Sequence, residues 1–367
     1  MNKLVLTLSL IWISTFTILP AQDIVIPALI SPTNPALVKE ELIYSLDQRP
    51  TPECHASTIV EVSDGMVAAW FGGTYERHSD VGIWVSIHRG NSWSKPIEVA
   101  NGFQNDSLRY PTWNPVLFKP EGGPLLLFYK VGPNPREWWG MLTSSADEGR
   151  TWSYPVKLGE NPAIGHLLGP VKNKPIQLSD GSLLCPSSTE VEDAAGTRWR
   201  VHFERSTDLG KSWEVYGPIN DGLEFDAIQP SILTYPNGSM QVLCRSMQGV
   251  LAQSWSKDGG KKWTPMRASM LPNPSAGTDA ITLKDGRQLL VYNHTRRKGD
   301  FPKGRNMLNV ALSDNGEDWK PVLTLERQEG EYSYPAVIQH TDGNIHITYT
   351  YQRRTIKYVV LDPDKMK

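Results

Sequence analysis

The stretch SADEGRTW, residues 145–152, places two carboxylates side by side in a polar segment. Asp147 and Glu148 could serve as a catalytic pair or hold a metal ion, with the guanidinium of Arg150 beside them. The stretch recurs, and every copy ends in a tryptophan: SIHRGNSW (86–93), STDLGKSW (206–213), SKDGGKKW (256–263) and SDNGEDW (313–319). A segment repeated every 50 to 61 residues indicates a structural unit rather than one catalytic centre.

The repeated stretch has a local physical explanation. Its Ser and Asp side chains can accept hydrogen bonds from backbone N–H groups of a turn, and its Gly can adopt a conformation closed to other residues. The Trp can then pack against a sheet. We therefore interpret Asp147, Asp208, Asp258 and Asp314 as turn residues at the outer edge of each repeat.

A second repeat runs out of phase with the first and consists of an apolar strand, a tight turn and another apolar strand. Each copy has the signature of a β-hairpin. The six turns fall at Asp64, Gly122, Asp180, Asn237, Asp285 and Asp342. The spacing gives about 57 residues per unit, enough for the four short strands of one propeller blade. With no convincing amphipathic helix, the sequence predicts an all-β fold, a six-bladed β-propeller.

The first 21 residues have the pattern of a secretory signal peptide. Lys3 supplies a positive charge, residues 4–19 form an apolar run, and small residues precede Gln22. The run is short for a membrane span. We expect a periplasmic or secreted protein in which residues 22–367 form one propeller domain, with residues 22–50 helping to close the ring.

Charge and cysteine content exclude several classes. The net charge is -2 and the charges are interleaved, so nothing favours nucleic acid as a partner. The three cysteines, Cys54, Cys185 and Cys244, show no zinc-site spacing with histidines, and we predict no structural metal and no cofactor.

The Ser-x-Asp-x-Gly-x-x-Trp stretches on a six-bladed propeller resemble the Asp boxes of the sialidase (neuraminidase) superfamily. The resemblance covers essentially the whole mature chain. It implies a site at the propeller axis with three arginines for the substrate carboxylate, an aspartate acid/base, and a tyrosine nucleophile backed by a glutamate.

Several segments resemble parts of that site. CRSMQG places Arg245 like the second arginine of the triad, and GRNMLNV places Arg305 like the third. In EYSYPAV, Tyr332 matches the nucleophile by its following Ser, whereas Tyr334 matches better by its distance from the turn. We rank Tyr332 first.

The loop FGGTYERHSD of the first repeat resembles the one that carries a ligand-contacting arginine and the acid/base aspartate. It supplies Arg77 and Asp80, although Asp80 could instead cap the turn. Two family residues are missing, because His55 stands in the slot of the first arginine and Gln229 in that of the glutamate. A glutamine cannot take a proton from a phenol. His55 is then a candidate general base or hydroxyl contact.

Further polar residues precede or follow the predicted inner strands. Arg136 lies in a basic and aromatic segment, Lys174 just before the third hairpin, and Glu190 just after it, where it could replace the lost glutamate. The candidate axis carries more cations than carboxylates, which favours an anionic ligand.

The resemblance and these residues together predict an exo-acting glycoside hydrolase that releases a terminal acidic sugar, either a sialic or keto-deoxy acid or a uronate. The expected partner is an acidic oligosaccharide or polysaccharide. Two alternatives remain open: a polysaccharide lyase in which His55 and a tyrosine move the proton, and a propeller that binds acidic glycans without cleaving them.

Overall fold

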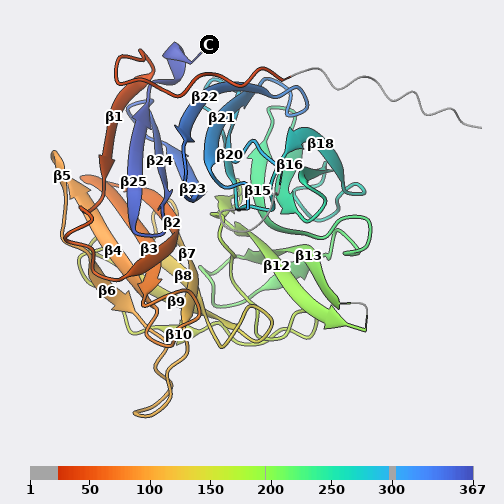
Figure 1. Ribbon diagram of the computed structural model, residues 1–367. Helices are drawn as coiled ribbons and strands as arrows, with labels where there is room; N and C mark the ends of the chain where they lie inside the picture. The colour runs from red at the N-terminus through yellow and green to blue at the C-terminus, as the bar shows by residue number, and fades with distance from the viewer. Residues whose placement is uncertain (1–23, 195, 297–302, 367) are drawn as a thin grey trace, which may run out of the picture.

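Six antiparallel sheets stand around a central axis in the computed structural model, which describes residues 24–194, 196–296 and 303–366 (Figure 1). Five sheets have four strands and the first has five. The predicted all-β six-bladed propeller is confirmed. Among the described residues the only helix is the short 3₁₀ turn Pro363–Lys365, so none of them forms a helix capable of crossing a membrane.

The strands follow one another blade by blade. Blades one to three contain β2 (Glu53–Val62), β3 (Gly65–Gly73), β4 (Gly82–Arg89), β5 (Ser92–Trp93) and β6 (Ile97–Ala100); β7 (Thr112–Phe118), β8 (Leu125–Val131), β9 (Trp139–Ser145) and β10 (Val156–Lys157); β11 (Ile176–Gln177), β12 (Leu183–Asp193), β13 (Gly196–Ser206) and β14 (Glu214–Tyr216). Blades four to six contain β15 (Ala227–Thr234), β16 (Met240–Ser246), β17 (Val250–Ser256) and β18 (Arg267–Pro272); β19 (Asp279–Thr282), β20 (Gln288–Tyr292), β21 (Met307–Ser313) and β22 (Lys320–Arg327); β23 (Tyr332–Gln339), β24 (Ile345–Tyr351), β25 (Thr355–Leu361) and β1 (Leu37–Leu42).

All six predicted hairpins form the first two strands of a blade. Their alternating apolar residues meet those of the next blade and make the core. One apolar layer joins Val67 of the first blade to Leu117 and Leu127 of the second, all buried. Burial of each such side chain stabilises the fold by about 1.5–3 kcal/mol, so the layers between blades hold the ring together.

The sixth blade combines both ends of the described chain. β1 pairs antiparallel with β25, from Leu37 opposite Leu361 to Leu42 opposite Lys357 (Figure 1). The ring is therefore closed by hydrogen bonds between the first strand and the last. The predicted signal peptide, residues 1–21, lies outside the described residues.

The Trp-ending stretches connect the third and outer strands of their blades. In the copy at 145–152, the Ser145 hydroxyl accepts from the Gly149 N–H at 2.8 Å, and Asp147 accepts from the Thr151 N–H and hydroxyl at 2.8 and 2.6 Å. These donors, the Thr151 hydroxyl first, lower the pKa of Asp147 to about 2. Asp147 is thus a turn residue rather than a proton donor.

The copy at 313–319 departs from our expectation. Asn315, not Asp314, occupies the Asp slot and accepts from the N–H groups of Glu317 and Asp318, both at 2.9 Å. The shortened copy shifts the slot by one residue relative to our alignment. The assignment of a turn role to Asp314 is therefore corrected to Asn315.

Each blade has one special position in or just before its inner strand, eight residues before the hairpin turn. In five blades the residue there has a left-handed backbone: Ala56 (φ 55°), Asn114 (φ 41°), Lys172 (φ 70°), Gln229 (φ 58°) and Tyr334 (φ 53°). The strand register shifts at the four of these that lie within a strand, as in a β-bulge. Non-glycine residues rarely adopt such angles. We call these positions, together with Gly277 in the fifth blade, the axial ring.

Candidate active site

A cleft of about 360 Å³ opens at the axis and is bordered by residues of the axial ring. Its walls combine arginines, carboxylates and aromatic rings from all six blades and their loops. They are His55, Glu76, Arg77, Trp113, Asn114, Pro135, Trp138, Glu190, Trp199, Ile228, Gln229, Arg245, Lys303, Arg305, Glu331, Tyr334 and Arg353.

Tyr334 is the central polar aromatic of the cleft. The bulge in β23 turns it to the axis, where its hydroxyl accepts a hydrogen bond from Nη1 of Arg245. The same nitrogen lies 3.3 Å from Oε1 of Gln229, and the guanidinium stacks over the Trp199 ring at 4.9 Å. Arg245 is thereby held in one orientation beside the phenol.

A buried carboxylate, Glu331, holds two further arginines. Its Oε1 accepts from Arg305 at 2.9 Å and its Oε2 from Arg353 at 2.8 Å, while Arg353 also reaches Glu76 at 2.7 Å. Burial raises the pKa of Glu331, but the guanidinium charges of Arg353 and Arg305 outweigh burial and hold this pKa well below the usual range. Glu331 therefore stays ionised and fixes both guanidinium groups.

His55 lies beneath the phenol rather than in the open cleft. Its ring is 2% exposed and packs 4.1 Å from the Tyr334 ring. Nδ1 lies 2.9 Å from the Thr350 hydroxyl, and Nε2 has no hydrogen-bond partner in the described part of the chain. Burial, followed by the nearby Arg353, depresses the pKa of His55 far below its ordinary value, so the ring is neutral at physiological pH.

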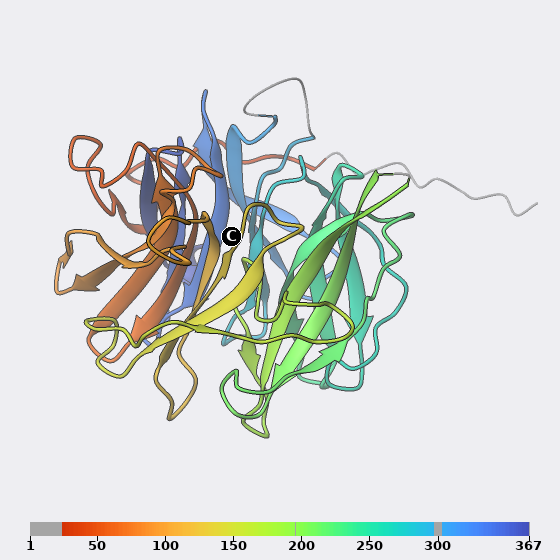
Figure 2. The ribbon, with the colours of Figure 1, turned by 90° about the horizontal axis from the view of Figure 1, so that it is seen from below.

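Glu190 is the one carboxylate of the cleft, among the described residues, whose pKa is raised. Burial is the main cause, and Arg245 and a hydrogen bond from Trp199 oppose it only in part. β12 and β13 are the longest strands, 11 residues each, and extend past their neighbours (Figure 2). Glu190 pairs directly with Trp199 on this extension. The long hairpin thus delivers a carboxyl group that is readily protonated.

The charges of the cleft favour an anionic ligand. Five cationic side chains line it against three carboxylates, and Glu331 is already committed to two of the cations. The Nε atoms of Arg245 and Arg305 are buried without a partner within the described residues. Buried donors of this kind normally have a partner, and a bound carboxylate would supply one.

Seven of the candidates named from sequence meet in this cleft: His55, Arg77, Glu190, Gln229, Arg245, Arg305 and the second-ranked Tyr334. Arg77 lies on the loop after β3 and is exposed, with a left-handed backbone at φ 82°. No ion pair or hydrogen bond of its guanidinium occurs among the described residues, which leaves this charge available to a ligand.

The preference for Tyr332 over Tyr334 is corrected. Tyr332 is fully buried in the apolar layer between blades five and six, and its hydroxyl donates to the Glu329 carbonyl at 2.9 Å. Two residues apart on a regular strand, Tyr332 and Tyr334 would face the same side, but the bulge at Tyr334 changes the direction of its side chain. Distance from the turn was therefore the better guide than the following serine.

Asp80, Lys174 and Arg136 also lie outside the cleft lining. Both oxygens of Asp80 accept from Thr74, through its N–H at 2.9 Å and its hydroxyl at 2.5 Å, so Asp80 caps the turn. Lys174 forms an ion pair with Asp279 at 2.8 Å. Arg136 forms an exposed ion pair with Glu192.

Sequence reasoning missed Arg353, Glu331 and Glu76. Arg353 lies in the turn after the second strand of the sixth hairpin, within YQRRTIK. Arg245 also comes at the end of the second strand of its hairpin, and this shared position was the available signal. Nothing in the sequence indicated that Glu331, next to the two tyrosines, would pair with arginines from two different loops.

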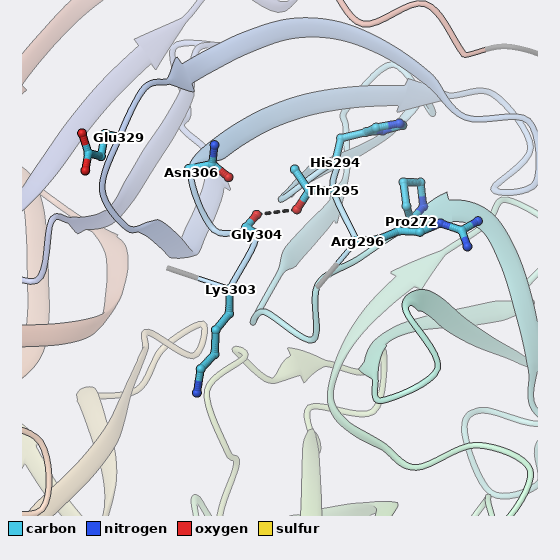
Figure 3. Close-up of a pocket in the computed structure, with 8 residues that line it drawn as sticks. All are labelled: Pro272, His294, Thr295, Arg296, Lys303, Gly304, Asn306 and Glu329. Carbon is cyan, nitrogen blue, oxygen red and sulfur yellow. Dashed lines mark hydrogen bonds between the residues drawn. The ribbon is translucent and has the colours of Figure 1, made fainter. Parts of the chain in front are cut away.

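A larger pocket of about 800 Å³ lies beside the central cleft and shares Lys303 with it (Figure 3). Its polar groups include Arg296, Lys303 and Glu329, which point in three different directions (Figure 3). Because these groups do not converge on one point, the smaller axial cleft is the better candidate site.

Comparison with known proteins agrees with this geometry. A family model described as a BNR repeat-like domain matches residues 64–347. A sialidase from Bacteroides fragilis is 26% identical over 320 residues, which is 75% of this chain and 54% of that protein. The chain thus spans about half the length of this relative.

Solved structures share the fold. A protein of unknown function from Dyadobacter fermentans superposes with a TM-score of 0.72 at 16% identity, covering 89% of this chain and 98% of that one. A sialidase from Streptococcus pneumoniae superposes with a TM-score of 0.69 at 14% identity, covering 92% and 72%.

Proposed function

The chain belongs to the BNR repeat-like domain family, within the sialidase-like superfamily, and on that premise we propose that it is an exo-acting glycoside hydrolase that releases a terminal acidic sugar from a glycan. The observation that carries the proposal is the phenol of Tyr334 at the axis, hydrogen-bonded by Arg245 and flanked by the guanidinium of Arg305, which lies 5.5 Å from the ring centre.

The arginines are suited to hold the carboxylate of the sugar. Arg305 and Arg353 are kept in place by Glu331, and Arg245 by Gln229 and the Trp199 ring. Guanidinium groups bind carboxylates through paired, charge-assisted hydrogen bonds. Preorganised donors cost little further ordering when the ligand arrives. Arg353 then takes the part of the first arginine of the triad, whose usual slot is filled by His55.

Tyr334 would attack or stabilise the anomeric carbon. A neutral phenol approaches an anionic sugar with less repulsion than a carboxylate does, and sialidases are the glycosidases that use tyrosine. The N–H that Arg245 donates to the phenol oxygen stabilises negative charge on that atom. In the covalent step the bond from the anomeric carbon to the leaving oxygen would break as the bond to the Tyr334 oxygen forms, and the phenol proton would pass to the neutral His55 ring, which packs 4.1 Å from the Tyr334 ring. Hydrolysis of this intermediate would retain the configuration of the sugar.

Glu190 is the proposed general acid in place of Asp80. A general acid must carry its proton at the working pH, and the raised pKa of Glu190 favours this. Gln229 cannot accept a proton and instead orients Arg245. We further propose that the protein acts in the periplasm or outside the cell, on the basis of the signal-like pattern of its first 21 residues.

The deciding experiment is incubation of the purified protein with sialosides, keto-deoxy-acid glycosides and uronate oligosaccharides, followed by mass analysis. We expect release of a single terminal acidic sugar with addition of water. A product with an unsaturated bond and new ultraviolet absorbance would assign lyase chemistry instead. Binding without turnover, seen by calorimetry over the same ligands, would show a glycan-binding propeller and refute the hydrolase.

A further inference from the structure

Two imidazoles and a carboxylate gather where the sixth blade meets the first, away from the axial cleft. His340, Asp342 and His346 lie on the β23–β24 hairpin, and each offers one ligand atom within 4.8 Å of the others. β2 of the first blade packs against β23 and β24 at this junction (Figure 1).

Each ring has one nitrogen committed to an outer partner. Nε2 of His340 lies 3.1 Å from Oε1 of Glu61 on β2, and Nδ1 of His346 lies 2.6 Å from the hydroxyl of Tyr358 on β25. Metal-binding histidines characteristically use the second nitrogen in this way, because an outer partner fixes the ring and its tautomer. The outer partners here come from two different blades.

The second nitrogen of His346 lacks a partner. His346 is only 7% exposed, and its buried Nε2 makes no hydrogen bond with any described residue. Nδ1 of His340 lies 3.0 Å from Oδ1 of Asp342 and accepts a hydrogen bond from the Asp342 N–H at 3.2 Å. A metal ion between the imidazole and the carboxylate could be bound by both.

The hairpin turn by itself does not require these histidines. Asp342 accepts from the Asn344 N–H at 2.8 Å, as Asp285 accepts from Arg287 at 3.0 Å in the fifth hairpin. The residues of the fifth hairpin that correspond to the two histidines are Leu283 and Leu289. The imidazoles are thus an addition specific to the sixth hairpin.

We propose that His340, Asp342 and His346 bind a divalent transition metal ion such as Zn²⁺, with water completing the coordination. Imidazole and carboxylate ligands suit zinc, whereas calcium and magnesium prefer oxygen alone. The ion joins the sixth blade to the first through Glu61 and Tyr358, which orient the rings. Our sequence prediction of no structural metal considered only Cys/His spacing and not ligands gathered by a hairpin.

The test is zinc binding by the full chain without a histidine tag, measured by equilibrium dialysis and calorimetry after treatment with chelator. We expect one saturable site for Zn²⁺ and none for Ca²⁺ at micromolar concentrations. Zinc should raise the midpoint of thermal unfolding, since a ligand that binds only the folded state stabilises it, and chelator should reverse the rise.

Asp342→Asn is the most informative variant, because Asn237 occupies the same turn position in the fourth hairpin and the turn is kept. This variant and His340→Gln should abolish the site, and Tyr358→Phe should weaken zinc binding about 10–100-fold through the orientation of His346. Asp285→Asn is the matched control and should bind zinc as the unmodified chain does. Absence of saturable zinc binding, or unchanged binding in Asp342→Asn and His340→Gln, would overturn the proposal.

Discussion

The two tyrosines of the EYSYP segment permit a matched test of the proposed site. Tyr334→Phe and Tyr332→Phe each remove one hydroxyl, two residues apart on the same strand. Tyr334 loses the group that Arg245 contacts in the cleft. Tyr332 loses a hydroxyl that donates to the Glu329 carbonyl and accepts from Gln352, both at 2.9 Å, inside the core.

The structure assigns opposite effects to the two changes. Without its attacking oxygen, Tyr334→Phe should lower kcat by at least about 100-fold, equivalent to about 2.7 kcal/mol of barrier. Its folding should change little, because Arg245 keeps Gln229 and Trp199 as neighbours. Tyr332→Phe loses two buried hydrogen bonds of about 1 kcal/mol each, so it should reduce the free energy of unfolding by about 2 kcal/mol and leave kcat nearly unchanged.

The measurements are initial rates on whichever acidic glycoside the unmodified protein cleaves, and urea denaturation of both variants. Equal kcat for Tyr334→Phe and the unmodified chain would show that the phenol takes no part in the reaction. A large loss of kcat in a fully folded Tyr332→Phe protein would instead place the chemistry on the other tyrosine and refute the assignment.

Three further predictions concern the cleft. Arg305→Ala should reduce kcat/KM by at least about 100-fold, because a carboxylate ligand loses a guanidinium partner. The exposed control Arg267→Ala should leave kcat/KM unchanged. Similar kinetics for both variants would show that Arg305 does not bind the substrate carboxylate. The rate should fall as pH rises past the raised pKa of Glu190, because the general acid then loses its proton. If the Glu190→Gln variant shows the same fall of rate at high pH, Glu190 is not the general acid. Gly277→Ala should lower kcat about 10-fold with a small loss of stability, because the added Cβ would lie 3.2 Å from the Tyr334 ring and displace it. A crystal structure of the variant with the Tyr334 ring in its original position, together with normal rates, would contradict this prediction.

The fold was predictable because its signals repeat. Hairpin turns such as Asp64 and Asp285 depend on local backbone preferences that any short segment displays, and six copies average out the errors of a single one. The same logic explains the mistake at Asp314, where a shortened copy gave two possible alignments and only the hydrogen bonds of Asn315 decide between them.

The site was predictable only in part, because its members come from different blades. Arg245 and Arg305 could be recognised because their segments resemble those of two arginines in the sialidase superfamily. Tyr334 could not be separated from Tyr332, since the choice depends on a left-handed bulge that alternation along a strand does not reveal. The pairing of Arg353 with Glu331 depends on the meeting of two loops, which no local pattern specifies.

At the axial ring, the conformation of the backbone does not depend on which side chain occupies each position. Residues as different as Ala56, Asn114, Lys172 and Gln229 adopt a similar left-handed backbone at equivalent places. Since the strand path sets the conformation and the side chain does not, the occupant of each position can be exchanged while the neighbouring strands keep their course. Three of these positions, Asn114, Gln229 and Tyr334, border the cleft, so a replacement there would change the groups offered to a ligand without a change in the path of the strands.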